Sequence, residues 1–85
     1  MSSAEKLLAR MMASKADWGE DDLHQLYLGF GFQYKAGAKH NFYFHPTHRG
    51  LYATVSRQKS LPTGYIQHAI KLIRQLKQLE AESHG

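Results

Sequence analysis

The chain contains no cysteine among its 85 residues. It can form neither a disulfide framework nor a thiolate metal site, so its fold must depend on apolar packing, as is typical of a cytoplasmic protein. Long hydrophobic runs are missing too: no apolar run exceeds three residues, whereas a membrane-spanning helix needs about 20. The N-terminus has no hydrophobic segment after its charges. We therefore expect a single cytoplasmic domain over residues 1–85, without a membrane span or signal peptide, and with one modest core.

Acidic residues are absent from residues 23–79, although the whole chain carries seven. The same stretch holds eight cations, and the net charge of the chain is +4. Solvated surfaces usually mix both signs, so an acid-free basic stretch favours nucleic acid as the partner. The alternative is that a small protein is simply basic. The eight cations are Lys35, Lys39, Arg49, Arg57, Lys59, Lys71, Arg74 and Lys77.

Two helices are predicted ahead of the first strand. Ser2 and Glu5 have the spacing of a capping box, and the apolar residues that follow predict a helix over residues 2–14. A second helix begins at the acids that follow Trp18 and is closed by a left-handed glycine, Gly29 or Gly31. Trp18 most simply covers the start of this helix, and the alternative is a platform on which a base stacks.

Three short strands are predicted next, over residues 32–35, 40–45 and 51–55, joined by short turns. In the second strand, His40, Phe42 and Phe44 alternate with Asn41, Tyr43 and His45, so both faces carry aromatic rings. This pattern predicts a central strand with a helix on one face and a contact surface on the other.

A long helix follows Thr63 and Gly64 and extends to about residue 79, and we expect residues 80–85 to form a frayed tail. The predicted order is α-α-β-β-β-α, an α+β fold in which helices cover one face of a three-stranded antiparallel sheet. That is the architecture of double-stranded-RNA-binding domains. The buried stripe of the long helix should be Ile66, Ala69, Ile70, Ile73 and Leu76.

Four short motifs, in this order and spacing, resemble those of HicA-type toxins, the RNA-cleaving partners of HicB antitoxins in bacterial toxin–antitoxin modules. The resemblance covers residues 18–79, and the helix over residues 2–14 is additional to it. The motifs are Gly31-Phe32, the run from Gly37 to Pro46, the run from Ala53 to Arg57, and the run from Pro62 to Ile66.

The resemblance implies a double-stranded-RNA-binding-like fold and a catalytic histidine at the start of the second strand. Anchoring the match on His45 and Pro46 carries that role onto His40. Two departures stand out. Lys39 occupies a position where the family often has serine, and the run from Val55 to Gln58 replaces a common Val-Pro-x-His. A second histidine that many members have is therefore absent.

RNA cleavage without a metal needs a base for the 2′-hydroxyl proton, a cation near the phosphorane and a proton for the leaving oxygen. Histidine suits proton transfer near neutral pH because its unperturbed pKa is about 6.5. We expect His40 to act as the base, and Lys35, Lys39, Arg57 and Lys59 to contact phosphate. The alternative for His40 is a structural role, as a turn cap or a partner of a carbonyl.

A metal site is not expected, although His40, His45 and His48 lie close together in the sequence. A structural zinc site usually takes four ligands, no cysteine or carboxylate lies nearby to complete one, and His40 and His45 differ in strand parity. We expect His45 and His48 to face solvent or contact phosphate, and no metal or other cofactor.

Two functions from different classes follow. The first is a metal-independent endoribonuclease, an mRNA-cleaving toxin that a HicB-type antitoxin neutralises. The second is a non-catalytic RNA-binding module that reads the shape of A-form RNA through phosphates and 2′-hydroxyls. A third reading is an adaptor whose basic face meets an acidic protein partner. Loss of the His40 imidazole separates the first from the second, because a binding module would not need it.

Overall fold

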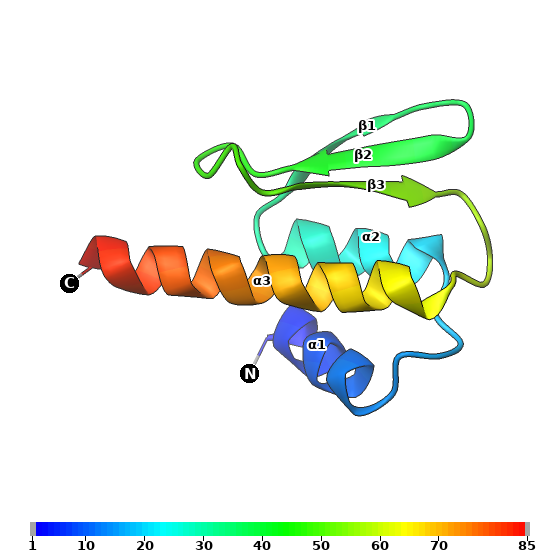
Figure 1. Cartoon of the computed structure of the whole chain (residues 1–85), viewed down its shortest axis with the longest axis horizontal. Helices are drawn as coiled ribbons and strands as arrows, with labels where there is room; N and C mark the ends of the chain where they lie inside the picture. Colours follow the sequence, from blue (N-terminus) through cyan, green and yellow to red (C-terminus); the bar gives the residue numbers. More distant parts are fainter. Residues whose placement is uncertain (1, 85) are drawn as a thin grey trace.

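The computed structural model describes residues 2–84 and forms two layers, a sheet and a set of helices on one of its faces (Figure 1). The three strands form an antiparallel sheet in the order β1-β2-β3, so β2 is central, as the sequence predicts. The elements in chain order are α1 (Ser3–Ala13), α2 (Glu20–Gly29), β1 (Gln33–Ala36), β2 (His40–Phe44), β3 (Tyr52–Ser56) and α3 (Thr63–His84).

Helix α1 begins as its capping sequence predicts. The Ser2 hydroxyl accepts a hydrogen bond from the Glu5 amide at 3.1 Å, which satisfies one of the free amides of the first turn. The Glu5 carboxylate meets Lys77 of α3 at 2.9 Å, and this contact links the two helices. Buried Leu8 and Met11 attach α1 to the core, so this helix is an integral part of the fold.

Gly19 caps the start of helix α2, and its amide donates to the Asp22 carboxylate at 2.8 Å. After the helix, Gly31 has φ +90, and this identifies it as the left-handed glycine of the two that the sequence offers. The turn directs Phe32 into the core, where it is buried, and the first strand begins one residue later than expected.

The alternation predicted for β2 is confirmed. Asn41 and Tyr43 are buried on the face that packs on the helices, whereas His40 and Phe42 are exposed on the other face. The strand register assigns the residues of β1 and β3 to the same two faces, because residues directly opposite each other on neighbouring strands share a face. His40 pairs with Ser56, and Phe42 pairs with Thr54 on one side and Lys35 on the other.

Helix α3 crosses the helix-facing side of the sheet and buries every residue of the predicted stripe. It continues through His84, so the end expected near residue 79 was wrong, and residues 80–84 are helical where a frayed tail was expected. The sequence from Gln78 to Glu82 has neither glycine nor proline and consists of residues with good helix propensity. Gly85 lies outside the described residues.

No helix within residues 2–84 combines the length and the apolar character that a membrane crossing requires.

Candidate nucleic-acid interface and histidine site

One face of the sheet is left uncovered by the helices (Figure 1), and we call it the open face. It carries three aromatic side chains. Tyr52 is 57% exposed and Phe42 is 39% exposed, while Phe44 is partly buried beside them. By strand register the open face consists of Gln33, Lys35, His40, Phe42, Phe44, Tyr52, Thr54 and Ser56.

The three rings touch and form one continuous surface, which we call the aromatic patch. Phe42 and Phe44 are stacked, with ring centroids 5.8 Å apart and an interplanar angle of 25°. Phe42 and Tyr52 lie 6.1 Å apart at 37°. A contiguous apolar patch on the surface of a small protein often marks an interaction site.

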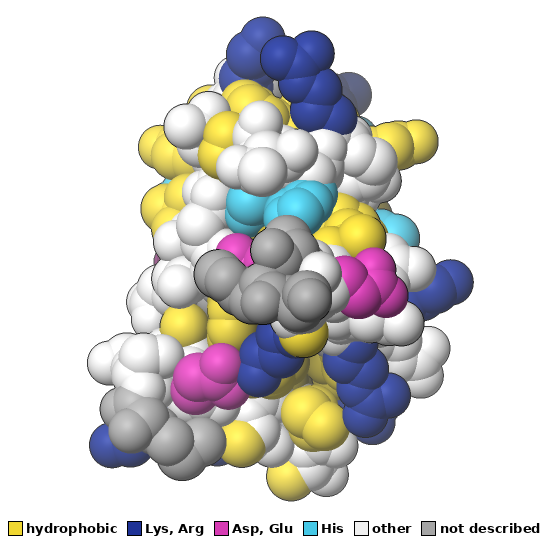
Figure 2. Space-filling model, turned by 90° about the vertical axis from the view of Figure 1, so that its left-hand side faces the viewer, with side chains coloured by type: hydrophobic (Ala, Val, Ile, Leu, Met, Phe, Trp, Pro, Cys, Tyr) yellow, Lys and Arg dark blue, Asp and Glu magenta, His cyan; other side chains and the backbone are white. Residues whose placement is uncertain are grey.

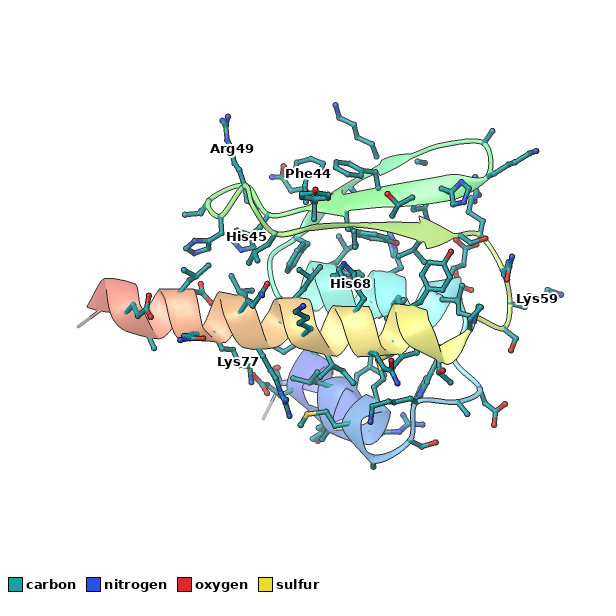
Figure 3. The ribbon with its side chains drawn as sticks, viewed as in Figure 1. Phe44, His45, Arg49, Lys59, His68 and Lys77 are labelled. Carbon is teal, nitrogen blue, oxygen red and sulfur yellow. The ribbon has the colours of Figure 1, made fainter. Side chains whose placement is uncertain are left out.

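A hollow of about 450 Å³ adjoins the aromatic patch at the end of the sheet near the β2–β3 loop. Arg49 from that loop lines it, and Figure 3 shows Arg49 and Phe44 on the side of the sheet away from α3. Figure 2 shows Lys and Arg side chains at the top of the view, where the sheet lies, and others lower down over the helices. The residues that line the hollow are Gln33, Phe42, Phe44, His45, Pro46, Arg49 and Tyr52.

His40 stands at the opposite end of the open face, at the first residue of β2. Its side chain is exposed, while its backbone is fixed by two hydrogen bonds. The His40 carbonyl accepts from the Gly37 amide at 2.8 Å, and the Lys39 carbonyl accepts from the backbone amide of Arg57 at 3.1 Å. The backbone that carries this imidazole is therefore fixed, and the exposed side chain is accessible to a ligand.

The four predicted phosphate contacts are placed differently. Lys39 adjoins His40, and Lys35 lies directly opposite Phe42 on the open face. Lys59 lies in the β3–α3 connection, away from the sheet, and its backbone packs closely on Gly19 (Figure 3). The structure therefore brings Lys35 to the face that carries His40, places Lys39 next to His40 at the entrance of β2, and does not bring Lys59 to that face.

Arg57 lies at the His40 end but its guanidinium is already engaged. Its Nη1 donates to the Gly37 carbonyl at 3.0 Å, and its Nε lies 3.9 Å from Glu20 Oε2. The sequence shows no acid near Arg57, and the acid arrives from α2 through the fold. Arg57 thus supports the turn that precedes His40.

A hydrogen-bonded group lies beneath His40, on the helix-facing side of β2. The Asn41 amide donates to Glu20 Oε2 at 3.2 Å and to the Tyr43 hydroxyl at 3.5 Å, and that hydroxyl shares a 2.8 Å hydrogen bond with His24 Nδ1. Burial raises the pKa of Tyr43 above its ordinary value, so this phenol stays protonated. These contacts join the start of α2 to the strand that carries His40.

His45 is buried, so the expectation that it faces solvent or contacts phosphate was wrong. It is 7% exposed, and its Nδ1 accepts from the amides of Thr47 and His48 at 3.1 and 3.2 Å. Its ring also packs edge-on against Phe32. The imidazole closes the β2–β3 turn by satisfying two amides, which no spacing argument reveals. Burial, and secondly the neighbouring His48, lower the pKa of His45.

Within residues 2–84 no three histidine, cysteine or acidic side chains come together in a group able to hold a metal ion. His40 at the start of β2 is exposed and His45, which follows the strand, is buried, so the two imidazoles have different environments.

Sequence reasoning predicted a contact surface on one face of the second strand but did not assign it to the aromatic patch and Arg49. The signal was present, because Phe42, Phe44 and Tyr52 share one face once the antiparallel register of β2 and β3 is drawn. It was incomplete without the structure, since alternation alone cannot say which of two aromatic faces the helices cover.

Comparison of the chain with protein-family models, curated proteins and solved structures found no match.

Proposed function

We propose that this chain binds RNA on its open face and cleaves it beside His40 as a metal-independent endoribonuclease. The observation that carries this proposal is the position of His40: an exposed imidazole on a fixed strand entrance, on the same face as Lys35 and next to Lys39. Strands β1 to β3 and the loops that join them contain no acid. An anionic backbone therefore meets no like charge along the open face itself.

The reaction needs only His40, two nearby lysines and solvent. His40 removes the proton of a ribose 2′-hydroxyl, and the resulting oxygen attacks the adjacent phosphorus. A 2′,3′-cyclic phosphate forms as the bond to the 5′-oxygen breaks, and that leaving oxygen takes a proton from water. Lys35 and Lys39 stabilise the added negative charge on the phosphorane.

We further propose that the α+β fold is of the double-stranded-RNA-binding type, and that the chain acts as a HicA-like toxin on mRNA. This proposal rests on the motifs that resemble HicA-type toxins and on the α-α-β-β-β-α order. A HicB-type antitoxin would then cover the His40 face. The contact surface of the antitoxin should be acidic, because it must complement the charges of Lys35 and Lys39. This electrostatic attraction would also accelerate association.

Expression in bacteria tests this function. Wild-type protein should arrest growth and degrade message, His40→Ala protein at equal expression should do neither, and an antitoxin-like neighbouring gene product should restore growth to the wild type. Harmless expression of the wild-type chain, or arrest by both proteins alike, contradicts the proposal.

A non-catalytic RNA-binding module is the second candidate. One observation favours it: Ser56 is the residue directly across from His40, so the cross-strand position holds no second imidazole for acid catalysis. This candidate predicts RNA binding that is equal for the wild-type and His40→Ala proteins, with no cleavage by either.

A further inference from the structure

We infer that the aromatic patch is a stacking platform for the unpaired bases of single-stranded RNA, with Lys35 and Arg49 holding its phosphates. The inference rests on the proposed function for the identity of the nucleic acid, and it assigns a role to Arg49 and three aromatic rings that the cleavage step does not use. The platform consists of Phe42, Phe44 and Tyr52.

The aromatic patch has no role in the core. The core of the domain lies on the other face of the sheet, where Tyr43, Ala53 and Val55 pack against the helices. Phe42 contacts both Phe44 and Tyr52, and Phe42 and Tyr52 keep large parts of their surfaces in water. Exposed rings that add little to folding are available to a ligand.

Ring geometry favours nucleobases as that ligand. Base stacking needs ring surface that is open to solvent, and Phe42 and Tyr52 keep 39% and 57% of their surfaces exposed, while Phe44 stacks on Phe42 within 25° of parallel. The bases of a duplex are already covered by their neighbours, so only unpaired bases can place a face on these rings.

Charge favours the same ligand. Lys35 is directly opposite Phe42, and Arg49 lines the hollow beside Phe44 and Tyr52, so a cation lies at each margin of the aromatic patch. No acid belongs to these strands or to the β1–β2 and β2–β3 loops. Aromatic rings bordered by cations are the common design of single-strand binding surfaces, in which bases stack and phosphates meet positive charge.

The platform is in line with His40. His40 and Phe42 are on the same face of β2 and two residues apart, which is about 7 Å along a strand. A strand of RNA whose base stacks on Phe42 therefore passes beside His40, and the platform would position the phosphodiester that His40 cleaves.

Binding in a His40→Ala background tests the platform, because the RNA then stays intact. The probes are a fluorescent oligouridylate, the same oligomer with abasic riboses, and a blunt RNA duplex of equal length. Fluorescence anisotropy measures the binding of each probe. Tyr52→Ala and Phe42→Ala are added singly. Tyr34→Ala is the matched control, because Tyr34 is 45% exposed on the same sheet but faces α2, where its ring meets His24 at 4.6 Å.

We expect each open-face variant to weaken oligouridylate binding on the order of 5- to 150-fold, as loss of one stacked base does. The abasic oligomer should bind as weakly to the parent, the duplex should bind more weakly than oligouridylate, and Tyr34→Ala should change affinity less than twofold. Circular dichroism and the fluorescence of Trp18, which packs on the core, report the fold of each variant.

Three results would overturn the inference: Phe42→Ala and Tyr52→Ala proteins that bind oligouridylate as tightly as the parent protein, preference of the parent for the duplex, or binding of the abasic oligomer as tight as that of oligouridylate. If the ring variants keep RNA binding and lose only an acidic protein partner, the face is a protein interface and the inference is wrong. Cleavage by proteins that retain His40 is scored separately. Ring-dependent binding without cleavage would leave the platform standing and reject the catalytic proposal, and ring-independent cleavage would do the reverse.

Discussion

Arg57 Nε lies 3.9 Å from the Glu20 carboxylate, although the sequence around Arg57 contains no acid. Both side chains are partly exposed, so the pair contributes little to stability. Its importance is electrostatic, because it places a negative charge of α2 at the end of the sheet where His40 and Lys39 lie. The basic stretch is acid-free in sequence and not in space.

Replacing Glu20 with glutamine should raise RNA affinity about two- to fivefold at low salt, the range of an exposed charge interaction. Glutamine removes the charge and keeps an oxygen that can accept from Asn41. Glu5→Gln is the control, since it removes the same charge from the Lys77 pair that links α1 to α3. Anisotropy titrations measure both variants. Equal gains for both would show that only net charge matters, and no gain for Glu20→Gln would show that Arg57 and Glu20 lie outside the RNA path.

Lys35 and Lys59 should differ in their effect on RNA binding, although sequence reasoning assigned both to phosphate. Lys35→Ala should weaken binding and lower the slope of log affinity against log salt by about one phosphate contact, because Lys35 lies on the open face. Lys59→Ala should leave the slope nearly unchanged, because the β3–α3 connection lies away from the sheet. The reverse order of the two slopes would place the RNA on another face.

Tyr27→Phe should stabilise the fold by about 1 kcal/mol. The Tyr27 hydroxyl is buried and has no hydrogen-bond partner among the described residues, so its desolvation is not compensated. The same burial raises the pKa of Tyr27, and the nearby Tyr43 raises it further. Urea unfolding measures the change. A loss of stability would show that the hydroxyl is hydrogen-bonded after all.

Local patterns were enough to predict the helix cap at Ser2, the parity of β2 and the buried stripe of α3. Each depends on contacts within a few residues or on a single period, and a sequence carries those directly. The placement of His40 at the entrance of the second strand followed from the glycine turn before it, whereas the exposure of its face could not be read from alternation.

Contacts between distant segments could not be predicted in this way. The approach of Glu20 to Arg57 depends on how α2 lies under the sheet, and the burial of His45 depends on a loop that folds its own amides onto the imidazole. The spacing of residues along the sequence indicates neither contact. The end of α3 was misplaced for a different reason, because a polar tail was interpreted as frayed although its residues favour helix.

The fold should lose stability as the pH falls below about 6.5, the ordinary pKa of histidine. His45 has a lowered pKa in the folded state, so the unfolded chain takes up the proton first and is favoured as pH drops toward the folded value. His48 strengthens this shift, and Glu80 of α3 opposes it. Protonation would also remove the Nδ1 acceptor of two amides.

His45→Asn should flatten this pH dependence, because asparagine keeps an acceptor and does not titrate. His68→Asn is the control, an exposed histidine of α3 whose loss should leave the profile unchanged. Unfolding free energies at pH 7 and pH 5 measure the effect. A wild-type fold that is equally stable at both values would show that His45 protonates without cost.

Single-turnover cleavage of a defined RNA in the presence of chelator tests the central claim, that His40 performs metal-independent cleavage, most directly. Wild-type protein should cut the RNA to a 2′,3′-cyclic phosphate, and a 2′-deoxy sugar at the cut position should prevent it. His40→Ala should bind as tightly, change the free energy of unfolding by roughly 0.5 kcal/mol or less, and cut on the order of 10²- to 10⁴-fold more slowly. Cleavage by His40→Ala at the wild-type rate, or loss of wild-type cleavage on chelation, would contradict the account.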